Sequence, residues 1–124
     1  MPSVFSHAIA AVAIGGVVVG GPSRLTIWGL GAICAVIPDL DVVSFHFSLP
    51  YGQMLGHRGL SHSLAFAAGL AAIVTMSLRR IQTASPSLGR LWVFFFLATA
   101  SHAVLDVMTD AGLGVAFFAP FSDM

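Results

Sequence analysis

Long apolar stretches alternate with short polar segments along this chain. Uncharged and mainly apolar residues fill positions 5–19, 25–37, 59–78 and 91–105. The 59–78 stretch has the roughly 20 residues that a helix needs to cross a bilayer. Gly20-Gly21-Pro22 ends the first stretch and Pro38 ends the second. The pattern predicts an all-α fold, an integral membrane bundle of about four helices that forms one domain over residues 1–124.

The segments between these stretches carry more specific expectations. We expect a polar loop at 39–58, a connector at 79–90 and an aromatic tail at 117–121 that lies at the membrane interface. The 25–37 stretch would span only about 20 Å of a roughly 30 Å hydrocarbon core, so it thins the bilayer or is partly re-entrant. Because Pro38 disfavours helical geometry in the residue before it, Asp39-Leu40-Asp41 is expected to be extended, with both carboxylates on one side. Gly16 and Gly20 have the spacing of a close helix contact.

Composition supports the membrane assignment and excludes several chemistries. Hydrophobic residues make up 57% of the chain and charged residues 8%, against roughly 25% charged residues in soluble domains. The chain has no Lys and no Glu, which excludes a Schiff-base lysine and the H-E-x-x-H metalloprotease helix. A net charge of zero gives no basic surface for nucleic acid. The single Cys34 is expected to be a small core residue.

The arginines predict how the bundle is oriented. Arg24 lies between the first and second helices, and Arg79, Arg80 and Arg90 lie between the third and fourth. The positive-inside rule places both connectors in the cytoplasm. The N-terminus, the 39–58 loop and the end of the fourth helix then share the opposite face.

The ionisable side chains gather at that shared face. In an up-down bundle, one end collects the start of the first helix, the end of the second, the start of the third and the end of the fourth. These places hold His7, Asp39, Asp41, His57, Arg58, His62, His102 and Asp106. His102 and Asp106 are four residues apart and so share a helical face. Since buried ionisable groups cost about 2–3 kcal/mol each in a membrane, a bound dication would offset an otherwise unfavourable cluster.

Several residues of these segments also allow a role other than metal binding. His46 has no partner in register and is expected to lie outside the site. Ser61, Ser63 and Ser101 adjoin histidines, but sequence neighbours seldom form a Ser–His pair and no G-x-S-x-G turn is present. A purely structural bundle with interfacial histidines is the remaining alternative.

The sequence resembles a family of bacterial inner-membrane, metal-dependent hydrolases described as LexA-regulated. The resemblance rests on Ser6-His7, on Ile37-Pro38-Asp39-Leu40-Asp41, on the segment 56–63 (GHRGLSHS) and on the segment 101–106 (SHAVLD), followed by Thr109-Asp110. It covers nearly the whole chain and implies a metal site in a multi-pass protein of the inner membrane. Family members usually continue past 120–122, so a short or C-terminally truncated member is expected. A fainter likeness in ligand order is to zinc-dependent phospholipase C and P1-type nucleases.

Together these arguments predict a membrane-bound metal-dependent hydrolase. It would act on a phosphoester or lipid-linked substrate through metal-activated water, at the non-cytoplasmic face. The expected ligands of one or two divalent ions, zinc before manganese or iron, are His7, Asp41, His57, His62, His102 and Asp106. Asp106 would bridge two ions, Asp39 would act as general base or orient a ligand, and Arg58 would bind an anionic oxygen. The alternative is a non-enzymatic metal-binding membrane protein, a sensor or a cation carrier; a transporter would need its ionisable groups near mid-membrane.

Overall fold

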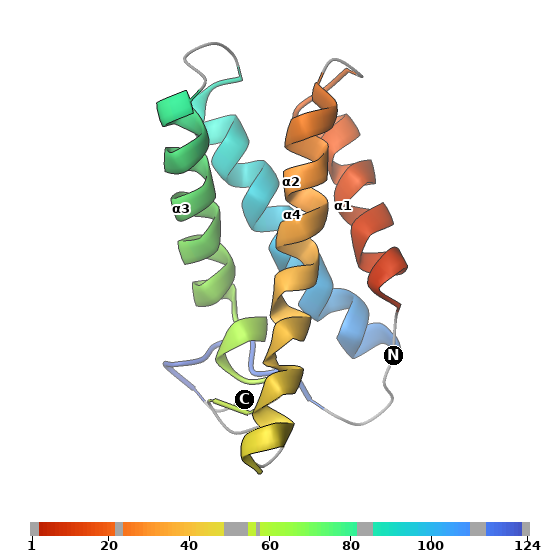
Figure 1. Ribbon diagram of the computed structural model, residues 1–124, viewed down its shortest axis with the longest axis vertical. Coiled ribbons are helices and arrows are strands. Elements are labelled where there is room, and N and C mark those ends of the chain that lie inside the picture. The colour runs from red at the N-terminus through yellow and green to blue at the C-terminus, as the bar shows by residue number, and fades with distance from the viewer. Residues whose placement is uncertain are drawn as a thin grey trace.

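The protein is an antiparallel bundle of helices. The computed structural model describes residues 3–21, 24–48, 55–56, 58–81, 86–109 and 114–122, with only the backbone at 44 and 45. Within these ranges it has no strand, and its helices are α1 (Val4–Val18), α2 (Leu25–Val36), η2 (Ile37–Phe47), η3 (Leu60–His62), α3 (Leu64–Ile81) and α4 (Leu88–Thr109). Both chain ends lie at the end of the bundle that holds η2 and η3 (Figure 1). The predicted all-α fold is confirmed.

The helices have the length and surface of membrane spans. Three helical stretches of the described chain are long and apolar enough to cross a bilayer, namely Leu25–Val43, Leu64–Ile81 and Leu88–Thr109, and Val4–Val18 is apolar but shorter. Large apolar side chains point outward along them; Val17 on α1 and Ile73 on α3 are 87% and 66% exposed. In water such a surface would be unfavourable, whereas lipid tails cover it without cost.

The second helix differs from its prediction. Ile37 has helical dihedrals (φ −52°, ψ −41°), and the chain runs on from α2 into the 3₁₀ helix η2. The expected extended Asp39-Leu40-Asp41 and the expected start of a polar loop at 39 are therefore wrong. Pro38 disfavours but does not forbid a helical residue before it, and in the first turn of a new helical segment its missing N–H is no loss. The proline changes the helix type instead of ending it, which lengthens the short second stretch into a full span.

Helix α4 is the centre of the packing and contacts the other three α-helices. Its Phe94 is fully buried, and a Cβ on Gly31 would lie 2.2 Å from the Phe94 ring. Gly15 is similarly tight, since its Cβ would lie 2.9 Å from Trp28. Gly20 instead has a φ of +84°, and a Cβ there would meet no atom of the described residues within 4 Å, so the predicted close packing at Gly16 and Gly20 is wrong. Close packing uses Gly15 and Gly31, where α1 and α2 meet Phe94.

Backbone hydrogen bonds fix the start of α3 against the C-terminal segment. Ser63 caps α3 by accepting from the Phe66 N–H at 3.1 Å. The Leu64 N–H donates to the Phe117 carbonyl at 3.0 Å, and the Ala116 N–H donates to the Arg58 carbonyl at 3.2 Å. Residues 58–64 are thus held on two sides, which positions Arg58 and His62 at the end of the bundle.

Candidate metal centre

Side chains from four parts of the chain meet at one end of the bundle. They come from α1, from η2, from the segment 58–62 that includes η3, and from the last turns of α4. The residues are His7, Asp39, Asp41, Arg58, His62, His102 and Asp106. The predicted convergence is confirmed for these residues as a convergence at one end of the bundle. The other predicted ligand, His57, lies outside the described residues, as does Asp110.

Four of these residues form a compact group of donor atoms. One atom each of Asp39, His62, His102 and Asp106 lies within 4.8 Å of all the others. The Nε2 atoms of His62 and His102 are 3.0 Å apart. His102 Nε2 is 3.3 Å from Asp39 Oδ1 and 3.7 Å from Asp106 Oδ2, and His62 Nε2 is 3.4 Å from Asp106 Oδ2. Tetrahedral ligands with bonds of about 2.0–2.1 Å lie about 3.3–3.4 Å apart, so the spacing fits one small dication.

Outer hydrogen bonds turn both histidines toward this group. His102 Nδ1 lies 2.7 Å from the carbonyl oxygen of Ala35. A carbonyl only accepts, so Nδ1 carries the proton and the Nε2 of a neutral His102 presents a lone pair inward. His62 Nδ1 lies 3.2 Å from Asp41 Oδ2, which favours the same tautomer. Two lone pairs 3.0 Å apart repel each other unless a metal ion or a proton lies between them.

Asp41 supports His62 from outside the four-atom group. Its Oδ2 accepts from the Arg58 N–H at 3.1 Å and from the Ser61 hydroxyl. Ser61 Oγ also lies 3.1 Å from His62 Nδ1. The predicted ligand Asp41 thus lies behind His62, and Asp39, predicted to have the outer role, lies within the four-atom group. A carboxylate behind a histidine is the usual arrangement around a bound metal.

The carboxylates also change how readily His62 holds a proton. Burial by itself lowers the pKa of His62, but hydrogen bonding to Asp106 and Asp41 outweighs it and raises the pKa above the ordinary 6.5. A proton on His62 and a cation in the four-atom group would therefore compete for the same place.

Asp106 connects the four-atom group to two further buried residues. Its Oδ2 is 3.4 Å from Arg58 Nε, and its Oδ1 is 3.6 Å from His7 Nε2. His7 stacks on His102 with ring centroids 3.8 Å apart. Neither ring nitrogen of His7 has a hydrogen-bond partner within the described chain. A buried imidazole without a hydrogen bond is costly, and the His7 ring lies on the Oδ1 side of Asp106, where a further ligand would meet it.

Arg58 is held in an unusual conformation for that contact. Its φ is 65°, in the left-handed region, and its side chain is 0% exposed. Such a conformation costs of order 1 kcal/mol and persists only where the surroundings fix it. The guanidinium, which was expected to bind an anionic substrate oxygen, lies directly against the Asp106 carboxylate. In this arrangement its first effect is to balance and orient that carboxylate.

Formal charges in the cluster match one dication. The described members comprise three carboxylates (Asp39, Asp41, Asp106) and one guanidinium (Arg58), which with neutral imidazoles leave a net charge of −2. One divalent cation brings this to zero, whereas two would leave an excess of +2. Uncompensated charge in a membrane bundle is strongly unfavourable, so charge balance favours a single ion.

A small surface pocket lies beside Asp41 of the cluster. It has a volume of about 200 Å³ and is lined by Asp41, Leu55, Gly56, Leu60, Ser61 and Phe66. Ser61, predicted only to be a poor nucleophile candidate, orients Asp41 and His62, a role that a serine directly before a histidine also signals. The Ala35 carbonyl carried no side-chain signal and could be found only from the structure.

The whole chain is similar to known inner membrane proteins. The whole chain, residues 1–124, matches the family described as YdjM inner membrane protein. The chain is also similar to the inner membrane protein YbcI of Escherichia coli (strain K12), with 40% identity over 126 residues that cover 99% of this chain and 70% of that protein. No solved structure matches the chain. Both descriptions agree with the predicted location in the bacterial inner membrane.

Proposed function

The chain belongs to the YdjM inner membrane protein family. For this inner-membrane protein we propose a function as a metal-dependent hydrolase of phosphoester or lipid-linked substrates. The observation that carries the proposal is the pair of inward Nε2 atoms, 3.0 Å apart, beside the oxygens of Asp39 and Asp106. Both outer nitrogens are engaged by acceptors, so the inner lone pairs are available only to a cation. Imidazole and carboxylate donors without a thiolate suit Zn²⁺ first, and Mn²⁺ or Fe²⁺ next.

Each residue of the cluster has a proposed task. His62, His102 and Asp106 would hold the ion, and Asp39, the most exposed of the four with 24% of its side chain accessible, is the carboxylate best placed to accept a proton. Asp41 and the Ala35 carbonyl accept from the outer nitrogens of the two histidines and so orient their inner nitrogens toward the ion. Arg58 keeps Asp106 ionised and in place. A dication held here would supply Lewis acidity, which favours deprotonation of water near neutral pH and polarises a phosphoryl oxygen.

The substrate class follows from where the cluster lies. It is at one end of an apolar bundle, next to the pocket lined by Asp41 and Ser61. The phosphoesters of membrane lipids lie at the depth of this end of the bundle, and an anionic phosphoryl group complements the cation. The arginines at the opposite end of the bundle support the proposal that this site lies on the non-cytoplasmic face.

The proposal is tested with purified protein in detergent. Metal content is measured by elemental analysis, and hydrolysis of bis(4-nitrophenyl) phosphate and of phosphatidic acid is followed with and without Zn²⁺. We expect bound zinc and metal-dependent hydrolysis, both of which disappear in His102→Gln and persist in His46→Gln. His46 is exposed at the end of η2 and matches the substitution chemically. Metal-independent hydrolysis, or zinc retained in His102→Gln, would contradict the proposal.

One observation favours the alternative of a metal-binding protein without catalysis. His62, His102 and Asp106 are at most 2% exposed, and four protein ligands would fill a tetrahedral ion. Structural zinc sites are closed in this way, while catalytic sites keep one position for water. The two functions separate in the same experiment, because a sensor or carrier would bind zinc with the same residue dependence and hydrolyse neither substrate.

A further inference from the structure

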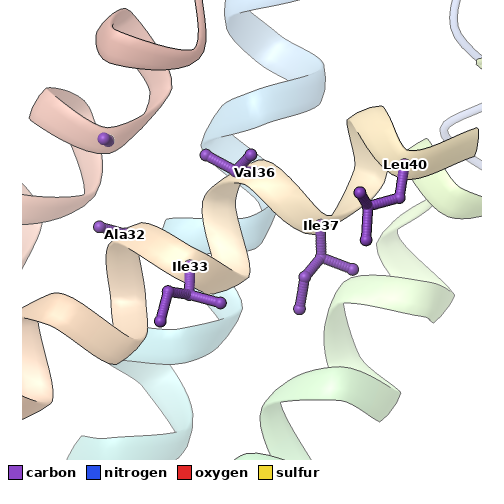
Figure 2. Close-up of a pocket in the computed structure, with 6 residues that line it drawn as sticks. Ala32, Ile33, Val36, Ile37 and Leu40 are labelled. Carbon is purple, nitrogen blue, oxygen red and sulfur yellow. The ribbon is translucent and has the colours of Figure 1, made fainter. Parts of the chain in front are cut away.

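An apolar groove runs along the second span and ends beside the candidate metal centre. It has a volume of about 400 Å³ and is lined by Ala8 of α1 and by Ala32, Ile33, Val36, Ile37 and Leu40 of α2 and η2. Ile33, Ile37 and Leu40 lie in a row along the helical segment (Figure 2). The volume is within the range of small-molecule sites, about 300–1,000 Å³, yet every lining side chain is apolar.

Both walls of the groove continue directly into the metal centre. Ala8 follows His7, and Leu40 follows Asp39. On each wall, therefore, one residue faces the groove while its neighbour contributes to the cluster, with Asp39 Oδ1 3.3 Å from His102 Nε2. From Ala32 to Leu40 the helical rise is about 14 Å, so the groove is long and ends at a polar, cation-binding point.

We propose that this groove holds one hydrocarbon chain of a membrane phospholipid whose phosphoester lies at the Asp39 end. The groove lies on Leu25–Val43, a candidate membrane span, so hydrocarbon is the surrounding medium. Because lipid tails are as apolar as the groove, the chain gains packing and not hydrophobic free energy. Its contribution is to position the phosphoester next to the donor group. The identity of the reacting group rests on the proposed hydrolase function, whereas chain binding does not.

The second pocket, at Leu55, Leu60 and Phe66, is the competing place for a chain. It is half as large, about 200 Å³ against about 400 Å³, and includes the polar Asp41 and Ser61. A carboxylate in its wall disfavours a methylene chain. This pocket suits water or a polar headgroup better, and the apolar groove suits the chain.

The test uses a phosphatidic acid that carries a photoreactive diazirine in its acyl chain, in phosphatidylcholine proteoliposomes. We expect cross-links to concentrate on peptides that contain Ala8 and residues 32–40. They should be lost in Ala32→Trp, which fills the groove from a half-buried position. Ile33→Trp is the second variant if Ala32→Trp does not fold. Ile73→Trp is its matched control, because both isoleucines are well exposed (60% and 66%) and only Ile33 lines the groove.

The outcomes separate this inference from the proposed function. Groove cross-links that Ile33→Trp abolishes and Ile73→Trp preserves support the chain site, even if neither lipid nor bis(4-nitrophenyl) phosphate is hydrolysed. Cross-links spread evenly over the exposed apolar faces, or concentrated at Leu55, Leu60 and Phe66, overturn it, even if hydrolysis is found. If hydrolysis is found, Ala32→Trp should lose activity on long-chain phosphatidic acid and keep activity on bis(4-nitrophenyl) phosphate.

Discussion

Replacing Asp106 with asparagine is the most direct perturbation of the cluster. Asp106 Oδ2 lies 3.4 Å from both His62 Nε2 and Arg58 Nε, and Oδ1 lies 3.6 Å from His7 Nε2. The amide keeps the shape of the side chain and removes its charge. The described cluster then changes from a net charge of −2 to −1, so a bound dication leaves one uncompensated positive charge in a buried site.

The structure allows the size of this effect to be worked out. Removing one partner from a buried charge cluster costs about 3–5 kcal/mol. If this cost falls on metal binding, the metal affinity decreases about a hundredfold to several thousandfold. At a zinc concentration of about 100 times the wild-type Kd, ligand binding stabilises the folded wild type by about 2.7 kcal/mol. With an affinity at least about a hundredfold weaker, Asp106→Asn gains at most about 0.4 kcal/mol at the same concentration.

Thermal unfolding in detergent, with and without Zn²⁺, measures this difference beside elemental analysis. The wild type should show a zinc-dependent rise in Tm that Asp106→Asn lacks. His46→Gln removes an exposed imidazole from the same end of the bundle and should keep the full rise, which excludes non-specific zinc binding to surface histidines. An equal zinc-dependent shift in wild type and Asp106→Asn would refute the metal assignment, because no other contact of Asp106 predicts a dependence on zinc.

Three further predictions follow from packing, orientation and the outer hydrogen bonds. Gly31→Ala should cost about 1–3 kcal/mol of stability, since its Cβ would lie 2.2 Å from Phe94, whereas Gly29→Ala, with nothing within 4 Å, should not lower Tm. A shift of equal size in both would contradict the packing argument. In a Cys34→Ala background, Ser87→Cys should react with an impermeant maleimide only after the inner membrane is permeabilised, and His46→Cys should react in intact cells; the reverse pattern would place the cluster in the cytoplasm. Ser61→Ala should weaken zinc binding about 10- to 100-fold by freeing Asp41 and His62. Ser101→Ala, whose hydroxyl donates to the Ala98 carbonyl at 2.8 Å, should leave the zinc affinity unchanged, and equal affinities in the two variants would remove Ser61 from the site.

The wrong predictions for Pro38 and for the Gly16/Gly20 pair share one physical origin. Pro38 is predicted to end a helix, but the local preference of the residue before a proline is weaker than the packing that carries α2 on into η2. Gly16 and Gly20 fit a known spacing, yet the glycines that packing requires, Gly15 and Gly31, are those that face Trp28 and Phe94. In both cases the deciding contact comes from a residue distant in sequence, and no local pattern shows it.

The sequence by itself determined the membrane class, the all-α bundle and the convergence of histidines and aspartates at one end. These follow from hydropathy and from the alternating direction of successive helices, which are properties of segments and need no atomic contacts. Only the tertiary structure decided which oxygen and nitrogen atoms meet. It placed Asp39 in the donor group and Asp41 behind His62, turned His102 with the Ala35 carbonyl and set Arg58 against Asp106. Those roles depend on contact distances between segments far apart in the sequence, and such distances are set only when the helices pack.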